Sequence, residues 1–119
     1  QGKVQLIYTS LDNNVVSAYE SLYQAAKEIK VPLVASDTDS VARGAVAAMG
    51  INYKDLGIET GKIVGRVLKG EKPGTIKPIT MNKLDLYLSP KHAQEVGITL
   101  PQELISQAAQ VEPAPKAKQ

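Results

Sequence analysis

The chain alternates short apolar runs with segments of helical periodicity, and this alternation limits its fold more than any other feature. Apolar and β-branched residues predict strands over 4–9 and 31–36, and small apolar residues predict a third buried strand over 44–51. Residues 83–88 alternate in polarity and predict a fourth strand. Strands that alternate with helices in this way indicate an α/β fold with an open parallel sheet flanked by helices.

Helices are expected between these strands, because each intervening segment has a start or stop signal. Apolar positions on one helical face predict a helix over 15–29, with a cap among the polar residues 12–14. A second helix follows the capping residue Asn52 and ends before Gly70, and a short helix over 89–97 begins with Ser and Pro. The result is a three-layer arrangement of the flavodoxin- or Rossmann-like kind.

The last part of the chain adds a short helix within 101–112 and a tail rich in Pro, Ala and Lys over 113–119, which we expect to be disordered. The sequence enters its first strand almost at once and has no initiator Met. We therefore expect it to be a piece of a longer protein. Its 119 residues suffice for one domain with a core.

Composition excludes several classes of function. A net charge of +2 gives no electrostatic case for binding nucleic acid, and five tyrosines without Phe or Trp give little surface for stacking bases. The absence of Cys removes thiol catalysis and cysteine-ligated metals, and a single histidine, His92, makes a zinc site implausible. We expect His92 at the surface, and neither a metal nor a cofactor.

Polar residues gather where the predicted strands end. The stretch "VPLVASDTDSVARG" passes from a buried strand to five polar residues, and "SLDNN" follows the first strand. In open α/β sheets, ligands bind beyond the carboxyl ends of the strands. Tyr53, which follows the third strand, belongs to the same edge. The candidate ligand-binding residues are Ser10, Asp12, Asn13, Asp37, Thr38 and Tyr53.

The two aspartates after the second strand allow more than one interpretation. Asp37 could bind an ammonium group through a charge-assisted hydrogen bond, while Asp39 or Ser40 caps the next turn. Both carboxylates could also serve only as caps. A standalone flavodoxin-like or receiver-like domain would instead bind Mg²⁺ or phosphate through Asp12, Asp37 and Asp39. No His or Lys lies nearby in sequence to separate two carboxyl pKa values, so the sequence gives little support for a catalytic carboxylate pair.

The segment 56–65 carries Gly61–Lys62 but does not match a phosphate-binding loop, since Leu56 stands where that pattern needs Gly. Glycines at 57, 61 and 65 form a smooth stripe on the predicted helix instead. Each costs roughly 1 kcal/mol relative to Ala, so we expect a closely packed partner element to offset them. Tyr19 and Tyr23 are expected to pack on the face of the first helix.

The run "YTSLDNNVVSAYESLYQAAKEIKVPLVASDTDSVARGAVAAMGINYKDLGIETGKIVGRVLKGEKP" resembles the C-terminal half of ABC-transporter solute-binding proteins. The similarity is to the type 1 periplasmic-binding fold that includes tryptophan- and tyrosine-binding lipoproteins. The later "LDLYLSPKHAQEVGITLPQELISQA" is similar to the end of that family. The resemblance implies two lobes, of which residues 1–51 and 83–112 belong to the C-terminal one. Residues 52–82 would contain the hinge crossings and a helix of the N-terminal lobe.

The same resemblance implies an extracytoplasmic receptor of an ABC importer, anchored as a lipoprotein or free in the periplasm, that binds an amino acid by hinge closure. Asp37 would hold its cationic group, and Tyr53 would line the hinge. The implied partners are the transporter's membrane subunits and either the missing N-terminal lobe or a second chain, such as a homodimer. A fragment with no function of its own is the remaining alternative.

Overall fold

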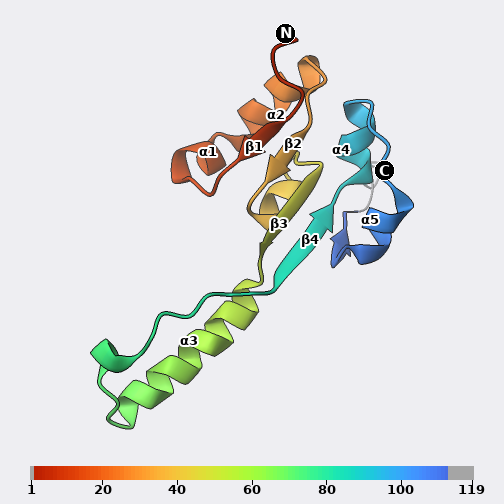
Figure 1. Ribbon diagram of the computed structural model, residues 1–119. Helices are drawn as coiled ribbons and strands as arrows, with labels where there is room; N and C mark the ends of the chain where they lie inside the picture. The colour runs from red at the N-terminus through yellow and green to blue at the C-terminus, as the bar shows by residue number, and fades with distance from the viewer. Residues whose placement is uncertain (1, 113–119) are drawn as a thin grey trace, which may run out of the picture. The chain divides into compact units, whose positions relative to one another are not determined.

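The computed structural model describes residues 2–112, which form two compact units (Figure 1). The first unit contains 2–50 and 85–112 of the described residues, and the second is Ile51–Leu84. In chain order, the elements before the second unit are β1 (Ile7–Thr9), α1 (Asn13–Ser17), α2 (Tyr19–Glu28), β2 (Leu33–Ala35), the 3-10 helix η1 (Thr38–Val41) and β3 (Ala47–Ile51). Those that follow are α3 (Tyr53–Leu68), the 3-10 helix η2 (Pro73–Thr75), β4 (Leu84–Leu88), α4 (Pro90–Glu95), α5 (Gln102–Gln107) and β5 (Gln110–Val111).

The strands form one five-stranded sheet in the order β1-β2-β3-β4-β5. The pairs β1–β2, β2–β3 and β4–β5 are parallel, with Thr9 opposite Ala35 and Val34 opposite Ala47. The predicted α/β fold with a mostly parallel sheet is therefore confirmed. Three details differ from the prediction: β1 starts at Ile7 rather than residue 4, β3 starts at Ala47 rather than residue 44, and β5 was not predicted.

The core of the first unit lies between α2 and the sheet. Tyr19 and Ala26 of α2 pack with Leu33 and Ala35 of β2 and with Ala48 of β3. These five side chains are 1% or 2% exposed. Full burial of a Leu side chain contributes about 1.5–3 kcal/mol. The helical spacing of the apolar residues in α2 therefore produces the contact that fixes this helix on the sheet, and Tyr19 packs as predicted.

The continuous helix predicted over 15–29 is wrong, because the helix is interrupted at Ala18. Asp12, one of the three predicted cap candidates, caps the first piece: its Oδ1 accepts from the amides of Asn14 at 2.8 Å and Val15 at 3.2 Å. At the interruption, Nη2 of Arg43 donates to the carbonyl oxygen of Val16 at 2.7 Å. A side chain that hydrogen-bonds to a helix carbonyl in place of the helix's own amide is a known cause of helix breaks.

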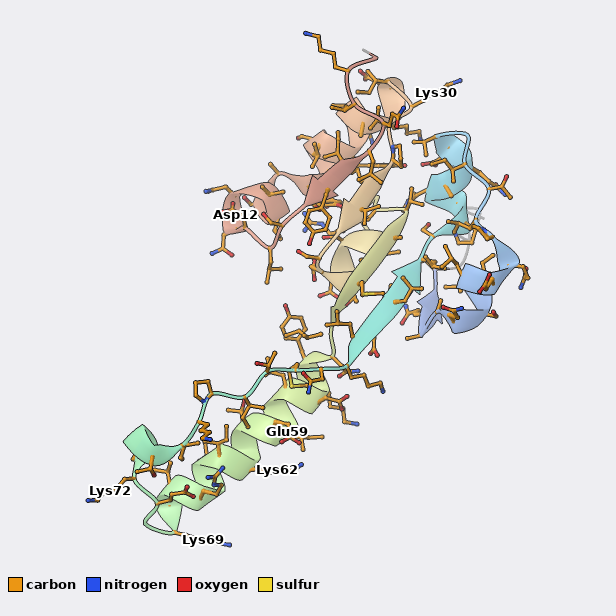
Figure 2. The ribbon with its side chains drawn as sticks, viewed as in Figure 1. Asp12, Lys30, Glu59, Lys62, Lys69 and Lys72 are labelled. Atoms are coloured by element: carbon orange, nitrogen blue, oxygen red, sulfur yellow. The ribbon has the colours of Figure 1, made fainter. Side chains whose placement is uncertain are left out.

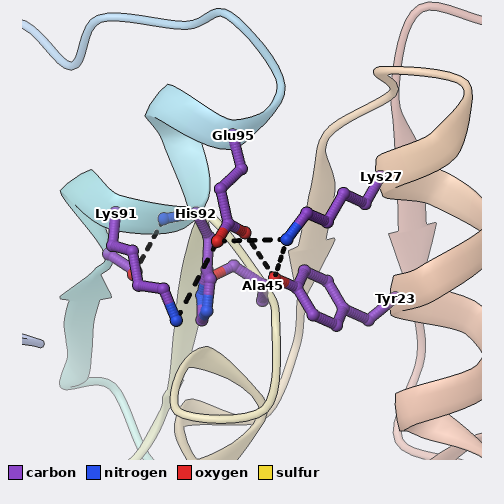
Figure 3. Close-up of polar contacts among 7 residues, drawn as sticks. Tyr23, Lys27, Ala45, Lys91, His92 and Glu95 are labelled. Atoms are coloured by element: carbon purple, nitrogen blue, oxygen red, sulfur yellow. Dashed lines mark hydrogen bonds and ion pairs between the residues drawn. The ribbon is translucent and has the colours of Figure 1, made fainter. Parts of the chain in front are cut away.

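A polar contact joins α2 to α4, as Figure 3 shows. The Tyr23 hydroxyl donates to Oε2 of Glu95, and Nζ of Lys27 lies 3.3 Å from Oε1 of the same carboxylate. Burial and the neighbouring Glu95 carboxylate both raise the pKa of Tyr23. Burial alone would raise the pKa of Glu95, but the hydrogen bonds from Tyr23 and Lys27 outweigh burial and lower it. The pair Tyr23–Glu95 thus connects two helices 72 residues apart in sequence.

His92 is buried, so its predicted place at the surface is wrong. Its exposed fraction is 7%, its ring centroid lies 5.2 Å from that of Tyr23, and its Nδ1 lies 3.3 Å from the carbonyl oxygen of Ala45. The local cause is the cap of α4: the side chain of Ser89 accepts from the amide of His92 at 3.3 Å. This capped start fixes the helix register that turns His92 toward the first unit's interior.

The second unit is built on α3, a helix of 16 residues that Asn52 caps through its side chain. Gly70 at φ +99° follows the helix end, as predicted. No residue of α3 is buried, and a Cβ added at Gly57, Gly61 or Gly65 would meet nothing within 4 Å among the described residues. Figure 2 shows Glu59 and Lys62 on this helix, which also contains the segment considered as a phosphate loop. The close packing partner expected for the glycine stripe is not found among residues 2–112.

Candidate functional site

The ends of β1 and β2 lie side by side, because Thr9 is paired with Ala35 in the parallel register. Beyond the pair, both the amide and the hydroxyl of Ser36 donate to the carbonyl oxygen of Thr9, at 3.1 and 3.2 Å. The first unit therefore brings together the two polar segments 10–13 and 36–38, which are more than twenty residues apart in sequence. This juxtaposition is the geometric basis of the candidate site.

The end of β3 approaches the same turn. A Cβ built on Gly50 would lie 3.1 Å from the carbonyl oxygen of Ser36 and 3.2 Å from Cγ2 of Thr38. The lack of a side chain at Gly50 therefore allows β3 to pass close to the turn that carries Thr38. Three strand ends contribute to one edge of the sheet.

Asp37 is half-buried and caps η1. Its Oδ1 accepts from the amide of Asp39 at 3.3 Å, and its Oδ2 accepts from Oγ of Ser40 at 2.7 Å. Ser40 is only 2% exposed, so the position of this carboxylate depends on a buried hydroxyl. A carboxylate has roughly four acceptor positions, so these two contacts leave it able to accept from a ligand.

Ser10, Asp12 and Asn13 are exposed at the start of α1. Figure 2 shows Asp12 at this point of the ribbon. The carbonyl oxygen of Ser10 accepts from the amide of Asp12 at 3.0 Å, which forms a tight turn before the helix. Both Asp12 and Asp37 therefore act as helix caps, as the capping interpretation states. Their role toward a ligand, like that of Ser10, Asn13 and Thr38, stays a prediction.

Tyr53 belongs to the second unit, where it begins α3 and is 53% exposed. Its predicted role as a ligand-contacting residue stays a prediction as well. Two surface hollows do not involve any predicted site residue. One lies within the second unit and includes Arg66, Lys77 and Asn82, and the other lies between α4 and α5 and includes Gln94 and Ile105.

Among residues 2–112, no group of three His, Cys, Asp or Glu side chains is arranged to hold a metal ion. Asp12, Asp37 and Asp39 therefore do not form the cluster that the Mg²⁺ interpretation requires. A hard divalent cation needs several oxygen ligands converging on one point. Asp12 and Asp37 instead each cap a different helical turn.

Arg43 is a residue beside the site that sequence reasoning missed. Its Nε donates to Oε1 of Glu20 at 2.7 Å, and its Nη2 donates both to Oε2 of Glu20 at 2.8 Å and to the carbonyl oxygen of Val16. The hydrogen bond from Arg43 lowers the pKa of Glu20 to about 2. A single Arg after a helical turn carries no sequence signal for these contacts.

Tyr19 lies beneath the same edge and is 1% exposed. Burial raises the pKa of its phenol, while the nearby hydroxyls of Thr9 and Ser40 act in the opposite direction. No hydrogen bond of normal geometry satisfies the Tyr19 hydroxyl among the described residues. The guanidinium carbon of Arg43 lies 5.5 Å from the centroid of the Tyr19 ring, within cation–π range.

The chain matches a known family. The model of the ABC transporter substrate binding proteins matches residues 1–112. This chain belongs to that family. The resemblance noted from the sequence is thereby confirmed, together with the family's α/β fold.

Two curated proteins are similar to most of this chain. A tyrosine-binding protein of Clostridioides difficile is 34% identical over 88 residues, which are 74% of this chain and 26% of that protein. An uncharacterized protein of Rickettsia prowazekii is 35% identical over 80 residues, or 67% of this chain and 26% of that protein. The chain thus spans about a quarter of the length of the curated relatives it matches.

Solved structures agree with the family assignment. A conserved domain protein from Vibrio cholerae superposes with a TM-score of 0.85 at 33% identity, covering 92% of this chain and 37% of that one. An ABC domain from Streptococcus pneumonia in complex with L-Trp superposes with a TM-score of 0.83 at 34% identity, covering 92% of this chain and 37% of that one. A ligand-free, open substrate binding protein with adhesive properties from Clostridium difficile has a TM-score of 0.72 at 28% identity, covering 95% of this chain and 38% of that one. Within residues 2–112, no helix has the length and apolar character needed to cross a membrane.

Proposed function

We propose that this chain is the C-terminal part of a non-enzymatic solute receptor of an ABC importer, and that it binds an amino acid by hinge closure between two lobes. The observation that carries the proposal is the pairing of Thr9 with Ala35, which brings the polar segments 10–13 and 36–38 to one edge of the sheet. Closure of two lobes on a ligand is a common device for coupling binding to a change of state.

An amino acid is the proposed ligand because the site offers acceptors for an ammonium group and because two relatives carry the names of amino-acid ligands, tyrosine and L-Trp. Asp37 would bind the ammonium group through a charge-assisted hydrogen bond. Polar atoms of the ligand would be oriented by Ser10, Asp12, Asn13 and Thr38. Tyr53 would line the hinge side of the site.

The proposed partner is an N-terminal lobe, with residues 1–51 and 83–112 as the C-terminal lobe and 52–82 as hinge crossings plus a helix of the other lobe. Support comes from uncovered apolar surface within each unit: Tyr8 and Met49 on the sheet are 62% and 53% exposed, and Leu68 on α3 is 82% exposed. Parallel sheets are normally covered on both faces. A homodimer that covers the same surfaces is the competing arrangement.

As a receptor of this kind, the protein would work outside the cytoplasm, in the periplasm or as a lipoprotein on the outer face of the membrane. It would deliver its ligand to the membrane subunits of the transporter. The family match and the partial coverage of longer relatives support this place in an importer.

A titration of the 119-residue chain with L-tryptophan and L-tyrosine, followed by amide NMR, tests the proposal. We expect shifts at residues 10–13, at residues 36–38 and at Tyr53. Asp37→Asn should abolish them, and the neighbouring control Asp39→Asn should retain them. Shifts confined to other residues, or none at about millimolar ligand (about −4 kcal/mol), would argue against it. Stabilisation by Mg²⁺ that Asp37→Asn abolishes would favour the Mg²⁺ alternative instead.

A further inference from the structure

We propose that Arg43 is a positioning residue of the candidate site, whose guanidinium holds α1 beside the turn that carries Asp37 and Thr38. The claim that the position of α1 matters for ligand binding rests on the proposed function. The structural claim itself, that α1 depends on Arg43 for its place, stands on contacts within the first unit.

The segment α1 has little means of holding its own position. It is five residues long, and none of its residues is buried. A helix of one and a half turns is unstable by itself, because nucleation costs more than so few hydrogen bonds return. Among its side chains, Val15 packs partly against the core. Asp12, Asn13 and Ser10 therefore sit on a segment whose placement must come from tertiary contacts.

Arg43 provides such a contact at the C-terminal end of α1. In an uninterrupted helix, the carbonyl of Val16 would accept from the amide of residue 20. Here Nη2 of Arg43 donates to this carbonyl at 2.7 Å instead, and the chain turns at Ala18. The guanidinium therefore replaces a helix hydrogen bond, and it fixes the point at which α1 separates from α2.

The guanidinium is itself held in one orientation. Two parallel hydrogen bonds to the carboxylate of Glu20 fix its plane, and the Tyr19 ring lies 5.5 Å away. Bidentate Arg–carboxylate pairs give geometric specificity that a Lys cannot reproduce. Arg43 thus contacts the chain on both sides of the break: Val16 of α1, and Tyr19 and Glu20 in the first turn of α2.

Arg43 is also joined closely to the turn of Asp37. Its amide donates to the carbonyl oxygen of Ser40 at 3.2 Å, and the Ser40 side chain donates to Oδ2 of Asp37. The charge of Asp37 adds to that of Glu20 in raising the pKa of Arg43, with the hydrogen bond to Glu20 the larger cause. One short, hydrogen-bonded segment therefore orients Asp37 and, through its arginine, sets the place of Asp12 and Asn13.

Amide hydrogen exchange on the 119-residue chain tests the structural claim. In Arg43→Met we expect exchange at residues 13–17 to rise roughly tenfold over wild type, while α2 and the sheet keep their protection. Arg43→Lys should give an intermediate rise if the bidentate contact is lost and the charge kept. The matched control is Arg66→Met, because Arg66 makes a similar paired contact with Glu71 in the second unit.

Unchanged exchange at 13–17 in Arg43→Met, or an equal rise throughout the first unit, would overturn the proposal. Should Arg43→Met fail to fold, Arg43→Lys and Glu20→Gln carry the test, with a rise confined to 13–17 as the expected result. A second measurement adds L-tryptophan or L-tyrosine: wild type should show shifts at both 10–13 and 36–38, and Arg43→Met should lose the former first. If wild type responds to neither probe, the proposed function fails, and the exchange result still decides the role of Arg43.

Discussion

The buried imidazole of His92 donates from Nδ1 to the carbonyl oxygen of Ala45 at 3.3 Å. A carbonyl oxygen can only accept, so Nδ1 is the donor in this hydrogen bond. The same ring lies against Tyr23 of α2. One side chain therefore connects α4, the segment before β3, and α2, which are far apart in the sequence.

Replacing His92 by Ala should destabilise the protein by about 2–3 kcal/mol, since it removes a buried hydrogen bond and opens space beside Tyr23. Urea denaturation followed by circular dichroism measures the change. The neighbouring control Lys91→Ala alters a partly exposed ion pair whose nitrogen lies 3.9 Å from Glu95. The free energy of unfolding of Lys91→Ala should stay within about 0.5 kcal/mol of wild type. Equal effects of the two substitutions would contradict the burial of His92.

A second prediction contrasts two glycines. Gly44 has φ +135°, and a Cβ there would overlap the ring of Tyr23 and lie 2.7 Å from its Cβ atom. Gly44→Ala should therefore cost about 3 kcal/mol or more through strain and overlap. Gly61→Ala, in the open middle of α3, should instead stabilise by roughly 1 kcal/mol through helix propensity. Thermal unfolding of both variants should show shifts of opposite sign, and a loss of stability in Gly61→Ala would show that α3 packs closely on another surface.

The ion pair of Glu20 and Arg43 predicts a dependence on acid. The hydrogen bond from Arg43 lowers the pKa of Glu20 from 4.5 to about 2. Because the folded-state pKa is depressed, the pair contributes its stability above pH 4.5 and loses it as the pH falls toward 2. Glu20→Gln should therefore be less stable than wild type near neutral pH, and the two should converge near pH 2.

Denaturation midpoints measured across this pH range give the comparison. Both groups are exposed enough for salt to screen them, so the difference should shrink at about 1 M NaCl. Glu28→Gln, an exposed position on the same helix, should keep the acid slope of wild type. A wild-type curve that runs parallel to that of Glu20→Gln over the whole range would contradict the assignment.

The hydrogen bond from Ser40 to Asp37 should be worth about 1–2 kcal/mol, because the hydroxyl is buried and its partner is charged. Ser40→Ala should show this loss in urea denaturation, whereas Ser106→Ala on the exposed face of α5 should change little. A double-mutant cycle with Asp37→Asn should give a coupling of at least about 0.5 kcal/mol. Additive effects would mean that Ser40 does not orient the carboxylate.

The sequence predicted the features that depend on neighbouring residues. The alternation of strands and helices follows from periods of two and 3.6 in the apolar residues. The caps Asn52 and Ser89 were predicted where the structure has them, and Asp12 is one of the three candidates predicted for the first helix. A cap needs only a suitable side chain two or three residues before the amides it satisfies. The polar segments after β1 and β2 were predicted to meet, since parallel strands place their carboxyl ends together.

Contacts between distant residues were decided only by the tertiary structure. Arg43 and Val16 are 27 residues apart, and His92 and Ala45 are 47 apart. No local periodicity encodes such pairs, so the break at Ala18 and the burial of His92 could not be predicted. The chain by itself thus determined the order of its elements and the chemistry at the edge of its sheet. The tertiary structure decided how the side chains at that edge are oriented, because this depends on which long side chains fill the spaces between the packed elements.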